Sequence, residues 1–299
     1  MTGLRTIRVG WIGLGAMGGP MAVVLAQAGH RVSAFDVAEG RAVSLAPQGI
    51  IPAATASEAV AGADVVALMV ATPAQAEAVL FGEDGLAGSL REGTVVLLMA
   101  TLGPAAVVSL ADRLAESGVD VVDAPVSGGT QRAATGDLLM MVSGSEGALA
   151  VVRPLLDAMA GSAPVVGPDV GDGQKVKLVN QLLCGVHIAV AGEALAFAEA
   201  MGLDARATWE VLRSGAAASF MLDDRGARMV DDGGTEVRSA LDIFVKDMGL
   251  VAEAARDSMF PAPLAAAAEQ LYLSGRRAGL GRRDDSSVIE VLRGNLSGH

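Results

Sequence analysis

Lys177 is the side chain best suited to proton transfer, because it lies within a strongly apolar stretch. Residues Gly173–Met201 read as one helix that is apolar on nearly all sides, and Lys177 lies in its first turns. Burying an amine is costly unless it meets a partner or a cavity, and burial beside a helix N-terminus favours the neutral form. A neutral amine accepts a proton from an alcohol near neutral pH, so Lys177 is a candidate general acid/base. A buried stem with its ammonium group at the surface is an equal alternative.

Further polar groups with suitable chemistry lie on the same helix and in a glycine loop. Asn180 and Gln181 follow Lys177 at i+3 and i+4 and share its face. The sequence DAPVSGG at positions 123–129 ends a strand at the carboxyl edge of an α/β sheet, where ligands of such folds bind. An ordinary glycine loop is the alternative. As a binding loop, it would offer a hydroxyl and backbone N–H groups to one carboxylate, from Ser127, Gly128 and Gly129.

Near the N-terminus, three glycines have the spacing G-x-G-x-x-G between an apolar strand and a helix. The first permits a sharp turn, the second lets the backbone approach a pyrophosphate, and the third lets the helix pack closely on the strand. The helix N-terminus adds unpaired N–H groups and a positive dipole end. A turn that only packs is the alternative. We expect a dinucleotide to bind the turn formed by Gly13, Leu14, Gly15, Ala16, Met17 and Gly18.

Asp36 follows the second expected strand, where an acidic side chain accepts hydrogen bonds from the ribose 2′-OH of a dinucleotide. A carboxylate at this position repels the 2′-phosphate of NADP, and the neighbouring Val37 and Ala38 carry no cation. The sequence therefore favours NAD over NADP. Arg41 lies a little further on and is the residue that argues for NADP.

The elements that must position these groups form two patterns. Up to about Gly167, short apolar runs alternate with alanine-rich helical stretches, which predicts a doubly wound parallel sheet of the Rossmann type. We expect helices over Ala105–Ser117 and Glu146–Ala160. The expected strands are Arg8–Ile12, Arg31–Phe35, Asp64–Val70, Thr94–Met99, Val119–Ala124, Leu138–Ser143 and Pro164–Val166. Met69 and Val70, at the end of the third strand, are expected to contact the cofactor.

After Gly167 the strand pattern ends and the chain reads as helices only. Asp204 and Ser219 stand where an N-cap is wanted. We therefore expect an NAD-binding domain over residues 1–168 and an all-helical substrate and oligomerisation domain over residues 169–299. The expected helices are Gly173–Met201, Asp204–Ser214, Ser219–Met229, Ser239–Ser258 and Pro261–Gly275.

The long apolar helix Gly173–Met201 bears on assembly. A helix that is apolar on all sides is buried all round, either between domains or between subunits. The second alternative favours a homodimer or homotetramer over a monomer.

Composition excludes several classes of function. The 299 residues predict about two domains. The net charge of −12, with no basic run and 3% aromatic residues, argues against nucleic-acid binding. We expect no membrane span, and a strand so near the N-terminus leaves no room for a signal peptide. The single cysteine, Cys184, excludes an internal disulfide and offers no metal cluster, so a reducing cytoplasm is the expected compartment.

Taken together, four segments resemble the β-hydroxyacid dehydrogenases, which include 3-hydroxyisobutyrate dehydrogenase, tartronate semialdehyde reductase and, more distantly, 6-phosphogluconate dehydrogenase. The segments are GLGAMGGPM, DAPVSGG, GDGQKVKLVNQ and FVKD, in family order over essentially the whole chain. Stretches such as GVHIAVAGEA and RRDDSSVIEV are most similar to the L-threonate dehydrogenase branch.

The resemblance implies a role for each matching position. Lys177 matches the catalytic general acid/base, and the loop at Ser127–Gly129 matches the one that holds the substrate carboxylate. Lys246, in FVKD, matches a lysine that reaches both nicotinamide and substrate. Thr101 matches a residue beside the nicotinamide, and Ser219 matches a segment that lines the substrate pocket.

One position departs from the family pattern. Most members carry Asn four residues after the catalytic lysine, whereas this chain has Gln181, with Asn180 beside it. The longer amide reshapes the pocket, which puts 3-hydroxyisobutyrate in doubt as the substrate and fits the threonate branch.

The expected reaction is oxidation of L-threonate, or another short polyhydroxy acid, to 2-oxo-tetronate or its counterpart with NAD. The alternatives in the same family are 3-hydroxyisobutyrate dehydrogenase and tartronate semialdehyde reductase. Imine reductases usually replace the lysine, and binding modules that lack activity tend to lose it, so Lys177 argues against both.

Overall fold

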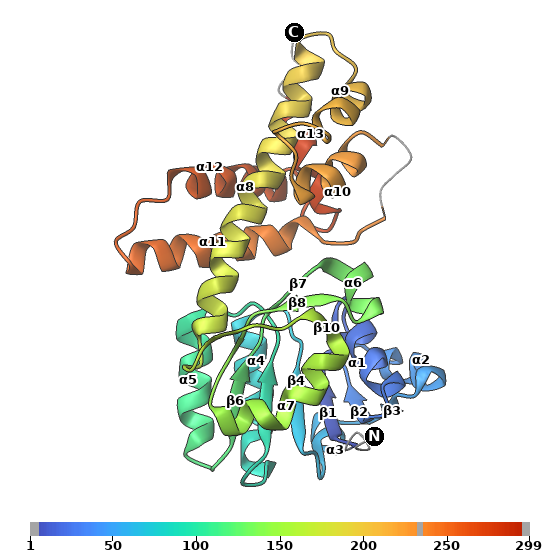
Figure 1. Cartoon of the computed structure of the whole chain (residues 1–299), viewed down its shortest axis with the longest axis vertical. Coiled ribbons are helices and arrows are strands. Elements are labelled where there is room, and N and C mark those ends of the chain that lie inside the picture. The colour runs from blue at the N-terminus through green and yellow to red at the C-terminus, as the bar shows by residue number, and fades with distance from the viewer. Residues whose placement is uncertain (1–5, 232–235, 295–299) are drawn as a thin grey trace. The chain divides into compact units, whose positions relative to one another are not determined.

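The protein is described by a computed structural model that covers residues 6–231 and 236–294 (Figure 1). The chain divides into two compact units, Met1–Lys177 and Leu178–His299. The first unit combines strands with helices and the second is helical, which confirms the expected fold class. One long helix, α8 (Asp172–Ala200), begins in the first unit and continues into the second.

The first unit is built on an eight-stranded sheet with the order β11-β9-β6-β5-β4-β1-β2-β3. Strands β1 to β6 run parallel to one another, so their carboxyl ends share one edge. β1 pairs with β2 on one side and β4 on the other, the switch point of a doubly wound sheet. The bounds are β1 (Arg8–Ile12), β2 (Arg31–Phe35), β3 (Ile51–Pro52), β4 (Val65–Leu68), β5 (Val95–Leu98), β6 (Asp120–Asp123), β9 (Val142–Ser143) and β11 (Val165–Gly167).

Helices cover both faces of this sheet (Figure 1). Along β5, Val95 and Leu97 join one apolar core with α1 and α7, and Val96 and Leu98 join another with α3, α4 and α5. A strand buried on both faces reads as an unbroken apolar run, which is why these strands are visible in the sequence. The helical segments are α1 (Gly18–Gln27), α2 (Arg41–Ser44), α3 (Ala56–Val60), α4 (Pro73–Phe81), α5 (Pro104–Ala115), α6 (Gly129–Thr135) and α7 (Glu146–Met159), with short 3-10 turns at Ala46–Gln48 and Ala87–Ser89.

The expected single strand Leu138–Ser143 is wrong in one respect. The chain breaks at Met141 into β8 (Leu138–Met140) and β9, which belong to different sheets. β8 pairs with β7 (Val126–Ser127) and β10 (Ala160–Ser162), whereas β9 runs antiparallel to β6. Apolar residues on both sides of the break hide it in the sequence, and the two- and three-residue strands β3, β7 and β10 are too short to show an alternation.

In the described part of the second unit, five further helices and a 3-10 turn accompany most of α8. The two expected N-caps are confirmed: Asp204 accepts a hydrogen bond from Ala207 N (2.7 Å) and Ser219 from Leu222 N (3.0 Å). In the core, the buried Tyr272 ring stacks on Phe244 with centroids 5.4 Å apart. The bounds are α9 (Ala205–Leu212), α10 (Phe220–Met229), α11 (Leu241–Asp257), α12 (Pro263–Arg277), η3 (Asp285–Ser287) and α13 (Val288–Gly294).

A buried ionic cluster joins α10 to the turn before α13. Arg228 Nη1 donates to Asp284 Oδ2 (3.1 Å), and Arg225 Nη2 donates to Asp285 Oδ2 (3.0 Å). Asp284 also accepts from Arg238 N (2.9 Å). Charges so far from water are tolerated because each is paired and hydrogen-bonded. The cluster therefore fixes the C-terminal segment against α10.

The long helix α8 is only partly covered within one chain. Half of its most apolar window is buried, and by length and composition alone the helix would suit a membrane span. Four apolar side chains at intervals of four and seven residues are at least half exposed: Val179, Leu183, Val190 and Phe197. This row of apolar side chains is therefore exposed along α8 in the described part of the chain.

Candidate active site

The glycine turn of the first unit has the geometry that a dinucleotide requires. A Cβ at Gly13, where φ is +95°, would lie 2.4 Å from Met69 O, and one at Gly18 would lie 2.1 Å from Gly13 O. Both positions therefore tolerate only glycine. At Gly15 a Cβ would meet no atom within 4 Å, so the backbone there faces open space. Leu14, Ala16 and Met17 complete the turn, which opens α1. These residues fit a pyrophosphate at a helix N-terminus.

Asp36 directly follows β2 and hydrogen-bonds to the glycine turn and to the backbone that follows β2. Its carboxylate accepts hydrogen bonds from Leu14 N (2.6 Å) and Ala38 N (2.7 Å), and Arg41 Nη1 lies 3.4 Å from each carboxylate oxygen. Beside it is a hollow of about 330 Å³, which lies where the adenosine end of a dinucleotide would be expected. Its lining residues are Phe35, Asp36, Val37, Ala38, Glu39, Gly40, Ala42, Val43, Ala53 and Ala54.

The remaining cofactor candidates of this unit follow neighbouring strands. Met69 and Val70 come directly after β4, and Thr101 lies between β5 and α5. Because the carboxyl ends of parallel strands share an edge, all of these positions lie along the edge where the glycine turn begins.

The loop of Ser127, Gly128 and Gly129 follows β6 by way of the short strand β7. Gly128 (φ +138°) and Gly129 (φ +74°) both have left-handed backbone angles that disfavour other residues. A Cβ at Gly129 would meet no atom within 4 Å. The loop leads directly into α6.

Lys177 lies in the second turn of α8, and its side chain is 5% exposed. The start of this helix is fixed at the carboxyl ends of β5 and β6. Gly173 N donates to Ser143 Oγ (3.0 Å), and Gln174 N donates to Asp123 Oδ2 (2.8 Å). The helix that carries the buried Lys177 is thus anchored at the carboxyl edge of the sheet, where ligands of open α/β folds bind.

Asp123 is fully buried beneath this helix start. Burial raises the pKa of its carboxyl to about 6, and hydrogen bonds from Gln174 and Ser143 oppose that rise.

Within the second unit, the structure joins three of the expected residues through a fourth. Asn180 Nδ2 donates to Gln181 Oε1 (2.8 Å), and Gln181 Nε2 donates to Asp247 Oδ2. Asp247 Oδ1 lies 2.9 Å from Lys246 Nζ. The unusual Gln181 is therefore part of a hydrogen-bonded chain that leads to the lysine of FVKD.

Ser219 is placed differently. Its hydroxyl is the N-cap of α10, bonded to Leu222 N, so its observed contact is structural. Its neighbour Phe220 is exposed.

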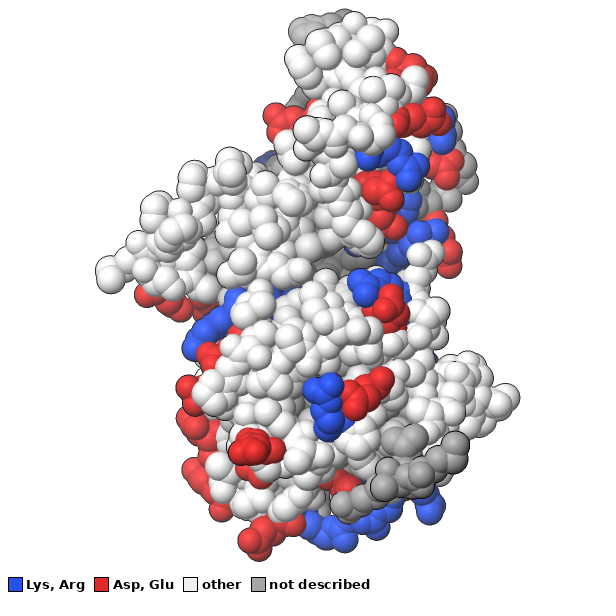
Figure 2. Space-filling view, in the orientation of Figure 1, with Lys and Arg blue, Asp and Glu red and all other residues white. Residues whose placement is uncertain are grey.

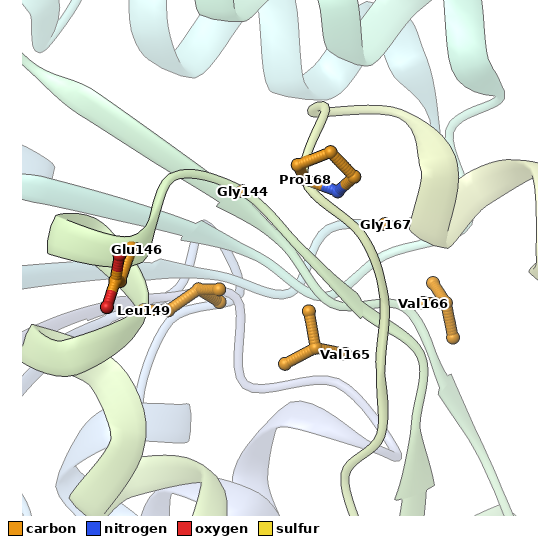
Figure 3. A pocket seen from close by; sticks show the side chains of 7 residues that line it. All are labelled: Gly144, Glu146, Leu149, Val165, Val166, Gly167 and Pro168. Carbon is orange, nitrogen blue, oxygen red and sulfur yellow. The ribbon is translucent and has the colours of Figure 1, made fainter.

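A further hollow of about 430 Å³ lies on the first unit (Figure 3). None of the expected site residues lines it. Its walls come from the turn before α7, from α7 and from the segment around β11, and they are mostly apolar: Gly144, Glu146, Leu149, Val165, Val166, Gly167 and Pro168.

Sequence reasoning missed three residues that position the site. Gln174 and Asp123 hold the start of α8, and Asp247 links Gln181 to Lys246. Each lies beside a residue that was singled out, within DAPVSGG, GDGQKVKLVNQ or FVKD. The available signal was their place within the segments that carry the family resemblance.

Two family models match almost the whole chain. The NAD-binding domain of 6-phosphogluconate dehydrogenase matches residues 8–167, and the NAD-binding domain of NADP-dependent 3-hydroxyisobutyrate dehydrogenase matches residues 171–292.

Individual proteins agree with the family models. An L-threonate dehydrogenase of Cupriavidus necator is 43% identical over 286 residues, which are 96% of each chain. Another, from Pectobacterium atrosepticum, is 39% identical over 95% of this chain and 93% of its own length. Among solved structures, a 3-hydroxyisobutyrate dehydrogenase from Salmonella typhimurium superposes with a TM-score of 0.89 at 38% identity, over 95% of this chain and 99% of that one.

The resemblance drawn from four short segments is thus confirmed over the full length. With the glycine turn, the acidic end of β2 and the buried lysine at one sheet edge, the chain belongs to the NAD-dependent β-hydroxyacid dehydrogenases, oxidoreductases that act on the CH–OH group of their substrates.

Proposed function

We propose that this enzyme oxidises L-threonate to 2-oxo-tetronate with NAD. The observation that carries the proposal is the buried Lys177, held at the carboxyl edge of the sheet by a helix whose start is fixed there. The choice of L-threonate is supported by the relative named for that reaction, at 43% identity, and by Gln181 in place of the usual Asn.

In this proposal Lys177 accepts the proton of the substrate hydroxyl. Ser127, Gly128 and Gly129 bind the substrate carboxylate through one hydroxyl and backbone N–H groups. NAD, when bound, supplies the hydride acceptor. The open backbone at Gly15 and the hollow beside Asp36 support its binding by the turn Gly13–Gly18 and by Asp36. Positioning of the reacting groups should supply much of the rate.

The other site roles rest on the family resemblance. We assign substrate contacts to Asn180, Gln181 and Ser219, contact with both cofactor and substrate to Lys246, and cofactor contacts to Met69, Val70 and Thr101. Residues 1–168 would then be the NAD-binding domain, and residues 169–299 the domain for substrate binding and oligomerisation.

The second domain also supports self-association. The four exposed apolar residues of α8 form one row along the helix, and Figure 2 shows few charged side chains over α8 and α12, whereas acidic and basic groups gather beside α10. A row repeating at about seven residues suits packing against another helix. We propose that a second copy of this chain covers it, in a homodimer or homotetramer in the cytoplasm.

The second candidate substrate is 3-hydroxyisobutyrate, because the Salmonella typhimurium structure of that name has a similar fold at 38% identity. Gln181 distinguishes the two. A longer amide leaves less space for a methyl branch and offers a hydrogen bond to an additional hydroxyl of a polyhydroxy acid.

The test is a spectrophotometric screen of NADH formation with L-threonate, D-threonate, 3-hydroxyisobutyrate and L-serine, each with NAD and with NADP. We expect the highest kcat/KM with L-threonate and NAD. A higher value with 3-hydroxyisobutyrate would replace the proposed substrate, and no turnover with any hydroxy acid would overturn the proposal.

A further inference from the structure

A buried polar cluster surrounds the start of α8, and the reaction as proposed does not use it. Asp123 and Gln174 are both 0% exposed. Gln174 uses all of its side-chain hydrogen-bonding groups: Nε2 donates to Asp123 Oδ1 (2.7 Å) and Ala100 O (3.0 Å), and Oε1 accepts from Leu102 N (2.9 Å) and Gly103 N (3.0 Å). One side chain therefore ties α8 to the segment between β5 and α5.

Both ends of this connection matter for the site. The segment from Ala100 to Gly103 contains Thr101, and Lys177 follows Gln174 by three residues, about one helical turn. Asp123 adds a second constraint, because its two oxygens bind the backbone N–H and the side chain of the same residue. Two bonds of this kind fix both the height and the rotation of the helix start.

We propose that Asp123 and Gln174 are positioning residues, which set the place of Lys177 relative to the loop that carries Thr101. The proposal rests on the catalytic role given to Lys177 above.

The alternative is that the cluster only stabilises the fold, but this explains less well why it contains a buried carboxylate and a buried amide. Elsewhere in this unit one hydroxyl is enough to cap a helix: Ser145 Oγ accepts from Ala148 N at the start of α7 (3.2 Å). A fully buried carboxylate and amide are a costly way to stabilise a helix, and apolar residues of similar volume are often at least as stable. What the buried carboxylate and amide add is a single position for the start of α8. The packing around Gly173 also restricts the helix start, because a Cβ there would lie 2.4 Å from Met141 O and 2.8 Å from Asp123 Oδ2.

The first experiment compares Gln174→Met with Ser145→Ala, each in the full-length enzyme. Met keeps the length of the side chain but removes every hydrogen bond. We expect kcat to fall by about 100-fold, as for a displacement of roughly 1 Å at a reacting group, while the Kd of NAD changes less than about threefold. Ser145→Ala removes an ordinary cap and should lower the melting temperature without lowering kcat.

The second experiment exchanges the partners. In Asp123→Asn the new amide can accept only one of the two bonds from residue 174, and in Gln174→Glu two carboxylates face each other. In the double variant, the amide at position 123 donates to the new carboxylate and still accepts from the backbone N–H, although the bond to Ala100 O is lost. We therefore expect the double variant to recover at least about tenfold in kcat over the weaker single variant. Equal losses with no recovery would overturn the pairing.

A third variant separates this proposal from the catalytic one. If Gln174 acts through Lys177, Gln174→Met should cause no further loss of kcat in a Lys177→Ala background, whereas an independent role would make the two losses multiply.

Amide hydrogen exchange of residues 173–177 should also accelerate in Gln174→Met, and this exchange can be measured without any substrate. Should the wild-type enzyme turn over no hydroxy acid, the proposed function fails, while unchanged exchange in Gln174→Met would overturn the positioning role.

Discussion

At the scale of single residues, Lys177 and its neighbour two positions earlier make a matched pair. Both are lysines at the start of α8. Lys175 is mostly exposed and pairs with Asp172 Oδ1 (2.8 Å), whereas Lys177 is buried. We predict that Lys177→Ala lowers kcat by about 10²–10⁴-fold, the usual contribution of a general base, because it removes the proposed proton acceptor. NAD binding, measured by calorimetry, should persist.

Lys175→Ala is the control and should retain near-normal turnover. Near-normal turnover in Lys177→Ala would instead remove the lysine from the mechanism.

Asp36 governs the choice of cofactor at the same scale. Its carboxylate repels a 2′-phosphate, and Arg41 is close enough to pair with one once the carboxylate is gone. We predict that Asp36→Ala raises the ratio of kcat/KM for NADP to that for NAD by at least about tenfold. In the double variant with Arg41→Ala, most of that gain should disappear. An unchanged ratio in the single variant would contradict the role of Asp36.

At the scale of elements, Asp123 links the start of α8 to pH. Burial raises the pKa of the Asp123 carboxyl from 3.8 to about 6. Between these two pH values, Asp123 holds a proton in the native protein that it has released in the unfolded chain. The stabilisation from this group is therefore fully present below about pH 4 and is lost as pH rises through about 6. We predict that the free energy of unfolding falls less between pH 4 and 6 in Asp123→Asn than in the wild type, measured by urea titration. Identical slopes would contradict the prediction.

The ionic cluster of the second unit gives a prediction of a different size. Asp284→Ala leaves Arg228 buried with a partner removed, which should cost about 3 kcal/mol of unfolding free energy. The control is Asp157→Ala, which removes an exposed pair with Arg153 on α7 and should cost no more than about 0.5 kcal/mol. Chemical denaturation measures both, and equal costs would show that burial does not matter here.

At the scale of the whole molecule, the proposal that a second copy of the chain covers the exposed row on α8 gives a prediction about the state of assembly. We predict that Leu183→Glu converts the oligomer to a smaller species, because a charge would be buried at the proposed interface. Light scattering after size exclusion measures the mass. Val211→Glu is the control, since Val211 is exposed on α9 outside the row, and it should leave the mass unchanged. A monomeric wild type would rule out the interface.

How far the sequence predicts this fold depends on whether a feature is set by neighbouring residues in the chain or by distant ones. Strands such as β1 and β2 are found at their observed bounds, because each is a short, largely apolar run between turns. The division of residues 138–143 between two sheets is not predictable in this way. It depends on which strands lie beside them, β6 in one sheet and β7 in the other, and no local property of the segment encodes that choice.

The site divides along the same line. Residue type and spacing alone identified the glycine turn, the acidic residue after β2 and the lysine in an apolar helix. Each is a residue type that stands out from the residues around it in the sequence. Only the tertiary structure decided what holds that lysine in place. Asp123 and Gln174 are 51 residues apart in the chain, and they meet because β6 ends where α8 begins. A hydrogen bond depends on distances of a few tenths of an ångström, which packing fixes and a sequence pattern does not express.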